Sequence, residues 1–324
     1  METIKVDFVD FWPGFIKDNN YLYNLLSKYY TLVIDNQPEI VFYSCYGNDY
    51  LKYNGVRVFY TSENIRPDFT GCDYAISFDF TDRENHYRLP LYCLYIDHLY
   101  NSGSKTKKLE ELIKIPTYDK IAEEFSNKKK FCCMVVSNDK SKKRLDFFNR
   151  LCKIKHVDSG GTVYNNVGGP VKDKLEFIKD YKFVISFENS SFPGYVTEKI
   201  LEPFMVNSIP IYWGNPLIQK DFNINRFINY DDFISEDDLI NKIIEIDNNN
   251  DEAIKILSEP IFPNNEIPKF IDDKNIMNFL RKIINNRNKV LPVTRSYKKY
   301  IHFLQRKKNS LHNIIASKTG RPFR

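Results

Sequence analysis

The pattern of apolar and polar positions predicts an α/β chain built in two passes. In the first pass, short runs rich in β-branched and aromatic residues predict a series of strands, and a longer apolar periodicity at 21–29 predicts a helix. The expected strands lie at 5–8, 31–34, 40–43, 56–60 and 74–78. A second pass begins with a strand at 131–136 and alternates strand and helix to about residue 246. Such alternation favours two parallel sheets that are covered by helices and face each other across a cleft.

Polar and charged residues at 101–108 and 126–130 separate the two passes and mark a change of domain. We therefore expect a first domain at 1–125, a second domain at 126–285 and a distinct tail at 286–324. No internal repeat is present, and the oligomeric state stays open.

The second pass contains a strand, loop, helix and strand unit. Its first strand lies at 182–187, its helix begins near Thr197, and its second strand lies at 209–213. The unpaired N–H groups and the positive dipole end of such a helix favour anions, and Lys199 adds a full charge in the first turn. The unit therefore predicts a site for a phosphorylated ligand. The alternative is an ordinary connection in which Glu198 and Lys199 are solvated.

The same segment resembles the donor-binding motif of the α1,3/α1,4-fucosyltransferases, glycosyltransferase family 10. The matching residues are Phe187-Glu188-Asn189 and Tyr195-Val196-Thr197-Glu198-Lys199. Two further stretches are similar to the family: 60–69 with 73–79, and 135–138 followed by Arg144, Phe147, Phe148 and Leu151. Ser62 and Ser77 stand where bacterial relatives usually have glycine. The likeness covers about the first 235 residues and points to the bacterial branch of the family.

The resemblance implies a GT-B fold, with an acceptor-binding Rossmann-like domain at 1–125 and a GDP-fucose-binding one at 126–285. It implies that Glu63 is the catalytic base and that Glu198 acts on the fucose. Arg144 and Lys199 are expected to hold the diphosphate, and Asn189 and Tyr195 are expected to line the donor pocket. The alternatives are that Glu63 is a surface carboxylate paired with Arg66, and that Arg144 is one of several solvated cations in 140–150.

The activity that the resemblance implies is inverting transfer of L-fucose from GDP-β-L-fucose. The expected acceptor is the 3-hydroxyl of N-acetylglucosamine in N-acetyllactosamine-type glycans, which gives a Lewis x type product on bacterial surface polysaccharide or lipopolysaccharide. Phe11, Trp12 and Tyr60 are suited to stacking on the acceptor sugars, although they are equally suited to a core. Two alternatives are a GT-B transferase that uses another nucleotide sugar, and an inactive glycan- or nucleotide-binding protein.

The chemistry-bearing residues give no support for a metal or a hydrolytic triad. The six cysteines form no C-x-x-C pair, and the five histidines have no metal-ligand spacing. The chain contains no Asp-x-Asp pair, the usual carboxylate clamp for a metal-bound nucleotide diphosphate. We expect no required cofactor, with divalent ions at most stimulatory, and a leaving group neutralised by Lys, Arg and helix dipoles.

The net charge of +5 is unevenly distributed. From Asn275 to the end of the chain there are 13 Lys and Arg and no Asp or Glu, and apolar residues recur at three- and four-residue intervals after Tyr297. This pattern predicts a basic amphipathic helix that binds an anionic membrane surface, or else a terminal helix packed on the body. No nucleic-acid-binding motif accompanies the charge.

With no apolar run of about 18 residues and no signal peptide, we expect a cytoplasmic protein, peripheral on the inner face of the bacterial cytoplasmic membrane.

Overall fold

The computed structural model describes residues 1–96, 108–289 and 291–319, and the side chains of 311–319 are not described. Of the polar stretch expected at 101–108, only Lys108 lies within the described residues. The chain forms two compact units. The N-terminal unit consists of Met1–Ser77, Thr81–Leu89 and the described chain from Asp272 on, and the central unit consists of Phe78–Phe80 and the described part of Pro90–Ile271.

The N-terminal unit is built on a six-stranded sheet with the strand order β2-β1-β3-β4-β5-β6, in which every neighbouring pair is parallel. The strands are β1 (Thr3–Val9), β2 (Thr31–Ile34), β3 (Ile40–Tyr43), β4 (Val56–Tyr60), β5 (Tyr74–Ser77) and β6 (His86–Arg88). The sequence pattern predicted the first five, and β6 was missed because a three-residue strand carries no apolar alternation. All residues of β3, β4 and β5 are buried, as expected for inner strands covered on both faces.

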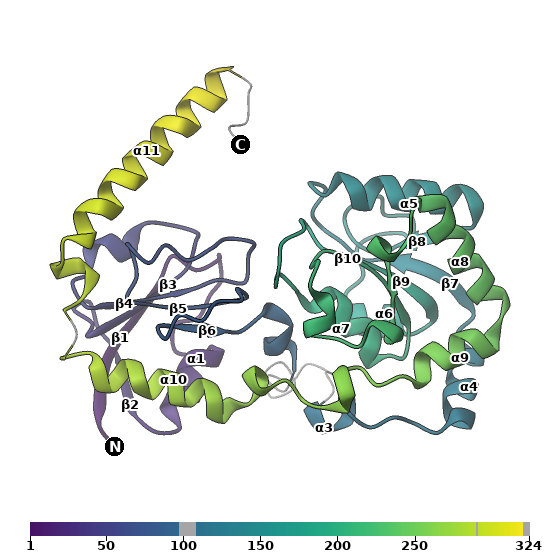
Figure 1. Ribbon diagram of the computed structural model, residues 1–324, viewed down its shortest axis with the longest axis horizontal. Helices are drawn as coiled ribbons and strands as arrows, with labels where there is room; N and C mark the ends of the chain where they lie inside the picture. Colours follow the sequence, from purple (N-terminus) through teal and green to yellow (C-terminus); the bar gives the residue numbers. More distant parts are fainter. Residues whose placement is uncertain (97–107, 290, 320–324) are drawn as a thin grey trace. The chain divides into compact units, whose positions relative to one another are not determined.

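Two helices cover this sheet close to one another in Figure 1: α1 (Tyr21–Ser27) and α10 (Asp273–Asn286). The side chains of Asn20 and Asp272 cap them by accepting hydrogen bonds from backbone N–H groups in the first turns. Phe279 of α10 packs edge-on against Tyr74, with ring centroids 6.0 Å apart. The helix α10 is therefore part of the N-terminal unit, although the sequence pattern assigned its residues to the second domain.

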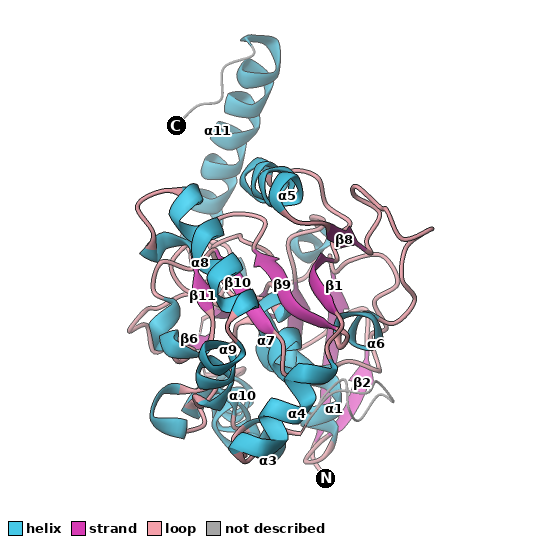
Figure 2. Cartoon of the chain, turned by 90° about the vertical axis from the view of Figure 1, so that its right-hand side faces the viewer, coloured by secondary structure: helices cyan, strands magenta, loops and turns pink. Residues whose placement is uncertain are grey.

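The central unit is built on a parallel sheet with the strand order β11-β10-β9-β7-β8. Its strands are β7 (Lys130–Met134), β8 (Val157–Ser159), β9 (Tyr181–Phe187), β10 (Ile209–Trp213) and β11 (Ile228–Asn229). One face packs in a single core with α4 (Tyr118–Asn127), α5 (Lys142–Ile154), α8 (Glu236–Asn248) and α9 (Asn250–Ser258). The other face carries α6 (Lys174–Ile178) and α7 (Glu198–Met205), and the short α3 (Leu109–Leu112) precedes α4. Figure 2 shows the strands β8 to β11 among these helices.

The end of the chain returns to the N-terminal unit before α11 (Lys298–Thr319) begins. Val293 and Thr294 are buried there; the backbone N–H of Val293 donates to Asp73 Oδ1 at 2.8 Å, and the Thr294 hydroxyl donates to the carbonyl of Asn54 at 2.9 Å. The segment expected to form a separate tail at 286–324 is thus joined to the first domain through its described part. The physical reason is that this basic stretch also carries buried side chains that pair with acceptors of the unit.

The helix expected in the basic tail is present as α11, which Figure 1 shows in yellow. In its described first half, the apolar side chains of Tyr300, Ile301, Phe303 and Leu304 are exposed rather than packed. No helix in the described part of the chain is long and apolar enough to cross a membrane.

Candidate active site

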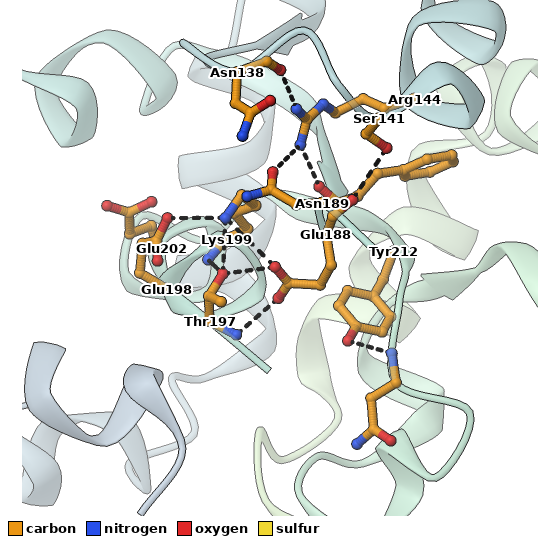
Figure 3. A network of polar contacts seen from close by, with 12 residues as sticks. Asn138, Ser141, Arg144, Glu188, Asn189, Thr197, Glu198, Lys199, Glu202 and Tyr212 are labelled. Atoms are coloured by element: carbon orange, nitrogen blue, oxygen red, sulfur yellow. Dashed lines mark hydrogen bonds and ion pairs between the residues drawn. The ribbon is translucent and has the colours of Figure 1, made fainter. Parts of the chain in front are cut away.

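The carboxyl end of β9 carries a buried carboxylate that organises the loop leading to α7. Glu188 directly follows the strand and is completely buried. Its two carboxylate oxygens accept hydrogen bonds from the backbone N–H and the hydroxyl of Thr197, both at 2.7 Å. Burial raises the pKa of Glu188, while Lys199 opposes that rise. Thr197 also caps α7, so one carboxylate fixes both the loop and the start of the helix (Figure 3).

Lys199 lies in the first turn of α7 and is enclosed by oxygen atoms. Its Nζ lies 2.9 Å from Thr197 Oγ1, 3.3 Å from Glu198 Oε1 and 3.4 Å from Glu188 Oε2. Burial works against its charge, but the two carboxylates prevail and raise the pKa of Lys199. Lys199 and Lys174 in turn lower the pKa of Glu198 against the effect of its burial. The ammonium group is therefore charged and already held in place in this structure.

Arg144 lies on α5 and points across the end of β9 toward the same loop (Figure 3). Its residue surface is 0% exposed, so it is no solvated cation at the start of a helix. The Nη1 atom donates to the carbonyl of Phe187 at 3.0 Å and to Asn189 Oδ1 at 3.1 Å, and Nη2 donates to the carbonyl of Asn138. Its Nε is buried without a hydrogen-bond partner among the described residues. Burial lowers the pKa of this guanidinium, yet arginine stays charged in proteins.

Two glycines allow close packing around Glu188 and the loop that follows it: Gly194 lies in the loop itself, and Gly214 lies after β10 (Ile209–Trp213) against the Glu188 side chain. Gly194 has φ = +88°, and a Cβ there would lie 2.5 Å from the carbonyl oxygen of Phe78. A Cβ on Gly214, after β10, would lie 2.5 Å from Cγ of Glu188. The amide of Asn215 accepts a hydrogen bond from the N–H of Gly194 at 2.8 Å. Close packing, rather than turn chemistry alone, therefore requires both glycines.

Tyr195 is buried in the described structure. It is 2% exposed, and its ring packs edge-on against Phe78 with centroids 5.3 Å apart. The predicted donor-site residues of the central unit, Arg144, Asn189, Tyr195, Glu198 and Lys199, thus all belong to α5 or to the connection from β9 to the first turn of α7.

Glu63 lies in the N-terminal unit, in the loop that follows β4. It is half-buried, and its Oε1 accepts a hydrogen bond from the hydroxyl of Tyr46 at 2.8 Å. Burial and this carboxylate raise the pKa of Tyr46, so the phenol stays a donor. Tyr46 follows β3, the neighbour of β4, and parallel strands place their carboxyl ends at one edge of the sheet. The carboxylate thus lies at the edge where α/β sheets bind ligands.

The aromatic residues expected at the acceptor surface divide between surface and core. Trp12 is 38% exposed, whereas Tyr60 is 3% exposed and its ring stacks on Phe11 with centroids 5.9 Å apart. Tyr60 is thus a core residue, Phe11 is half-buried, and Trp12 is exposed. Asp10, just before them, has φ = +60° and is held by accepting hydrogen bonds from the N–H groups of Asp49 and Tyr50.

The sequence pattern missed several residues that build the site. Glu188 lies in the matched motif, but the sequence pattern assigned it no role. Its position directly after a buried strand could have indicated that it is buried and organises the loop. Asn138, Ser141 and Gly214 act through contacts made by distant segments, which no local pattern shows. Within the described residues, no group of three or more His, Cys, Asp or Glu side chains is arranged to hold a metal ion.

The comparisons with known proteins agree with this architecture. The N-terminal domain model of α-(1,3)-fucosyltransferase FucT matches residues 6–95, and the C-terminal model of glycosyltransferase family 10 (fucosyltransferase) matches residues 125–257. A crystal structure of an α1,3-fucosyltransferase with GDP-fucose superposes with a TM-score of 0.74 at 30% identity, over 90% of this chain and 93% of that one. The fold and site define a GT-B glycosyltransferase. The chain belongs to glycosyltransferase family 10, the fucosyltransferases.

Two relatives illustrate the range of the family. The chain is 37% identical over 270 residues to α-(1,3)-fucosyltransferase FucT of Helicobacter pylori, which covers 74% of this chain and 56% of that protein. It is 30% identical over 166 residues to the human 4-galactosyl-N-acetylglucosaminide 3-α-L-fucosyltransferase 9, over 48% of this chain and 45% of that protein. The chain therefore spans about half the length of these two relatives.

Proposed function

We propose that this protein transfers L-fucose from GDP-β-L-fucose, with inversion at the anomeric carbon, to the 3-hydroxyl of N-acetylglucosamine in N-acetyllactosamine-type glycans. The strongest support is the 30% identity, over 90% of the chain, to an α1,3-fucosyltransferase crystallised with GDP-fucose. The name of the human relative specifies a 4-galactosyl-N-acetylglucosaminide and a 3-linkage, which supports the proposed acceptor. The relative from Helicobacter pylori supports a bacterial setting, for which we propose a surface polysaccharide or lipopolysaccharide.

In this reaction Glu63 accepts the proton of the acceptor hydroxyl as the oxygen attacks the anomeric carbon. The C–O bond to GDP breaks in the same step, and the leaving diphosphate keeps the bonding electron pair. The Tyr46 hydroxyl donates to Oε1 of Glu63 and so orients that carboxylate, which leaves its other oxygen to face the acceptor. One displacement converts the β-linked donor into an α-linked product without a covalent intermediate.

Lys199 and Arg144 neutralise the departing diphosphate. The buried Nε–H of Arg144 has no acceptor among the described residues, and a phosphate oxygen would satisfy it. The backbone N–H groups of the first turn of α7 add the positive end of the helix dipole. We propose that no metal is required for this transfer and that a divalent ion at most speeds product release.

The contacts of Lys199 also imply which of its three oxygen partners a donor phosphate would replace. An ammonium group has three protons, and its Nζ already contacts Thr197, Glu198 and Glu188. Glu188 has no exposed side-chain surface, and both of its oxygens are held by Thr197, whereas the Glu198 side chain is 16% exposed. We infer that the phosphate replaces Glu198 on Lys199. The released carboxylate then contacts the fucose hydroxyls or offsets the positive charge that develops on the ring.

The decisive experiment presents the purified protein with a panel of nucleotide sugars and N-acetyllactosamine and measures the nucleoside diphosphate that is released. We expect GDP from GDP-fucose, and NMR analysis of the product should place fucose on the 3-hydroxyl of N-acetylglucosamine. Release from another nucleotide sugar alone would assign a different GT-B activity. Fucose on galactose would refute the acceptor while keeping the donor.

We further propose that the protein acts in the cytoplasm, on the inner face of the bacterial cytoplasmic membrane, to which α11 binds peripherally. The support is the exposure of Tyr300, Phe303 and Leu304 beside Lys307 and Lys308 in the described first half of the helix. Apolar side chains that enter the headgroup region next to cations are the features of interfacial helices. Binding to anionic but not to neutral vesicles is the expected measurement.

A further inference from the structure

His302 differs from the other residues around it on α11. Among Lys298–Ser310, the part of the helix whose side chains are described, His302 alone is buried, with 7% of its surface exposed. Its Nδ1 lies 2.9 Å from Asp68 Oδ2, and its Nε2 lies 2.8 Å from the hydroxyl oxygen of Tyr50. Gly71 makes room for the ring, since a Cβ at that position would lie 2.5 Å from Cε1 of His302. The helix thus inserts one imidazole between two loops of the N-terminal unit.

Both loops lead to Glu63. Asp68 lies five residues after Glu63 in the same loop, where its carbonyl accepts hydrogen bonds from the N–H groups of Gly71 and Cys72. The Asp68 carboxylate also accepts from the N–H and the hydroxyl of Thr70, at 2.9 and 2.6 Å. His302 therefore holds the end of the loop that carries the proposed base.

The second loop reaches Glu63 through Tyr46. The N–H of Tyr50 donates to Asp10 Oδ2 at 2.9 Å, and the carbonyl of Asp10 accepts from the N–H of Tyr46 at 3.0 Å. Tyr46 then donates its hydroxyl proton to Glu63. A continuous series of contacts thus runs from His302 through Tyr50 and Asp10 to the group that holds the carboxylate of Glu63.

The donors and acceptors around the imidazole are matched. The hydrogen bond from His302 lowers the pKa of Asp68 to about 2, so that carboxylate only accepts and Nδ1 carries a proton. Burial raises the pKa of Tyr50, so its hydroxyl stays protonated and can donate a hydrogen bond to Nε2 of His302. Gln305 and Arg306 of α11 add contacts to Thr70 and Asn48 in the same two loops. One helix turn therefore holds both loops together.

We propose that His302 is a positioning residue for the transfer reaction, which holds the loops after β3 and β4 so that Glu63 points correctly at the acceptor. This inference rests on the proposed role of Glu63. It assigns a catalytic contribution to a residue of the basic C-terminal helix, far from Glu63 in sequence. The first turns of the helix then have two functions: buried His302 orders the acceptor side, and the exposed apolar residues around it remain available to the membrane.

The test compares kinetics of the full chain with those of His302→Phe, which keeps the ring volume and loses both hydrogen bonds. We expect kcat to fall about 10-fold or more, since small misplacements of a catalytic group cost up to about 100-fold, while KM for GDP-fucose changes less than about 2-fold. Lys299→Ala, on an exposed position of the same helix, is the control and should behave as the full chain does. A folded His302→Phe protein with unchanged kcat overturns the proposal.

Two further variants separate positioning from simple stability. Tyr50→Phe removes only the hydroxyl, because its ring stays stacked on Tyr43 with centroids 4.1 Å apart, and it should lower kcat in the same way even if His302→Phe does not fold. Combining Tyr50→Phe with Tyr46→Phe should cost little more than Tyr46→Phe alone, because both act through the carboxylate of Glu63. If the double variant lowers kcat by the product of the two single effects, the loops act independently, and the series of contacts from His302 to Glu63 is refuted.

Hydrogen exchange supplies a readout that needs no activity. In His302→Phe, the backbone amides of 44–52 and 61–72 should exchange faster, while those of the central unit stay unchanged. If the unmodified protein transfers no fucose yet this difference appears, the proposed function fails and the loop-holding role of His302 stands. If the unmodified protein transfers fucose and neither kcat nor exchange responds to His302→Phe, the inference alone fails.

Discussion

The donor-site residues of the central unit and the proposed base of the N-terminal unit are held in opposite ways. On the donor side, in the central unit, Lys199, Glu188 and Thr197 lie within twelve residues of one another and bond directly across a single loop. On the acceptor side, in the N-terminal unit, Glu63 is half-buried and its placement depends on Tyr46 and on contacts that reach as far as His302.

This difference explains what the sequence could show of each. The contacts of Lys199 lie within a compact motif, whereas Glu63 lies in a stretch similar to the family but the residues that hold it come from remote loops, which no local pattern shows. The donor side should therefore fail mainly at positions in the 188–199 loop and at the residues that contact it, such as Arg144. The acceptor side should respond to substitutions far from Glu63.

The largest expected effect is on the acceptor side, at the base itself. Glu63→Gln should lower kcat by about two to four orders of magnitude while GDP binding stays nearly intact, because a positioned general base contributes about that much. Glu84→Gln, a carboxylate whose side chain is 93% exposed, is the matched control. More than about a tenth of the original rate in Glu63→Gln would remove Glu63 from that role.

On the donor side we expect loss of binding as well as of rate. Lys199→Met and Arg144→Lys should each weaken GDP by about 10- to 100-fold, as lost charge-assisted hydrogen bonds cost about 1.5–3 kcal/mol. Lys142→Ala changes an exposed cation on the same helix as Arg144 and should leave affinity unchanged. Calorimetry with GDP makes the comparison, and equal affinity in all three variants would refute the diphosphate clamp.

The N-terminal unit should also be the more sensitive half toward acid. Burial, with Arg66 and Arg88 nearby, lowers the pKa of His86 to about 4 from an ordinary value of 6.5. Since the unfolded chain binds the proton more readily, this group's contribution to stability is complete above about pH 6.5 and is lost as the pH falls toward 4. The expected loss is up to about 3 kcal/mol.

Thermal unfolding of His86→Gln from pH 7 to pH 4 measures this effect. Its midpoint should depend less on pH than that of the unmodified protein, in which the Ser77 hydroxyl lies 2.8 Å from Nε2 of His86. His156→Gln, with a side chain that is 76% exposed, should reproduce the original pH dependence. Parallel curves for all three proteins would show that His86 is not held neutral by its surroundings.

A smaller effect is expected from shortening α11. Removal of the chain after Lys308 keeps His302, Gln305 and Arg306, so kcat should stay within about 2-fold while attachment to anionic vesicles weakens, by at most about 1 kcal/mol for each cation lost. Removal after residue 290 also deletes the buried Val293 and Thr294 and should destabilise the N-terminal unit. Full vesicle binding by the protein that ends at Lys308 would confine the membrane contact to the first half of α11, where Tyr300, Phe303 and Leu304 are exposed.

The smallest expected effect is that of chelation. Excess EDTA should leave transfer from GDP-fucose nearly unchanged if, as we propose, Lys199, Arg144 and the α7 dipole hold the diphosphate without a metal. Complete loss of activity that a divalent ion restores would show that carboxylates of this chain form a metal clamp after all. Such a result would revise the donor side and leave the assignment of Glu63 untouched.

The amino-acid sequence by itself determined the parallel α/β character, most of the strands and the donor motif. Strand and helix periodicities depend on local burial, and the residues from Phe187 to Lys199 are neighbours along the chain, so both can be predicted from the pattern. The tertiary structure alone decided that Glu188 is the centre of that loop, that Tyr60 is core, and that α10 and the start of α11 belong to the N-terminal unit. These features depend on contacts between residues up to about 250 positions apart, such as Tyr50 with His302, and no local pattern of hydrophobic and polar residues encodes such a pairing.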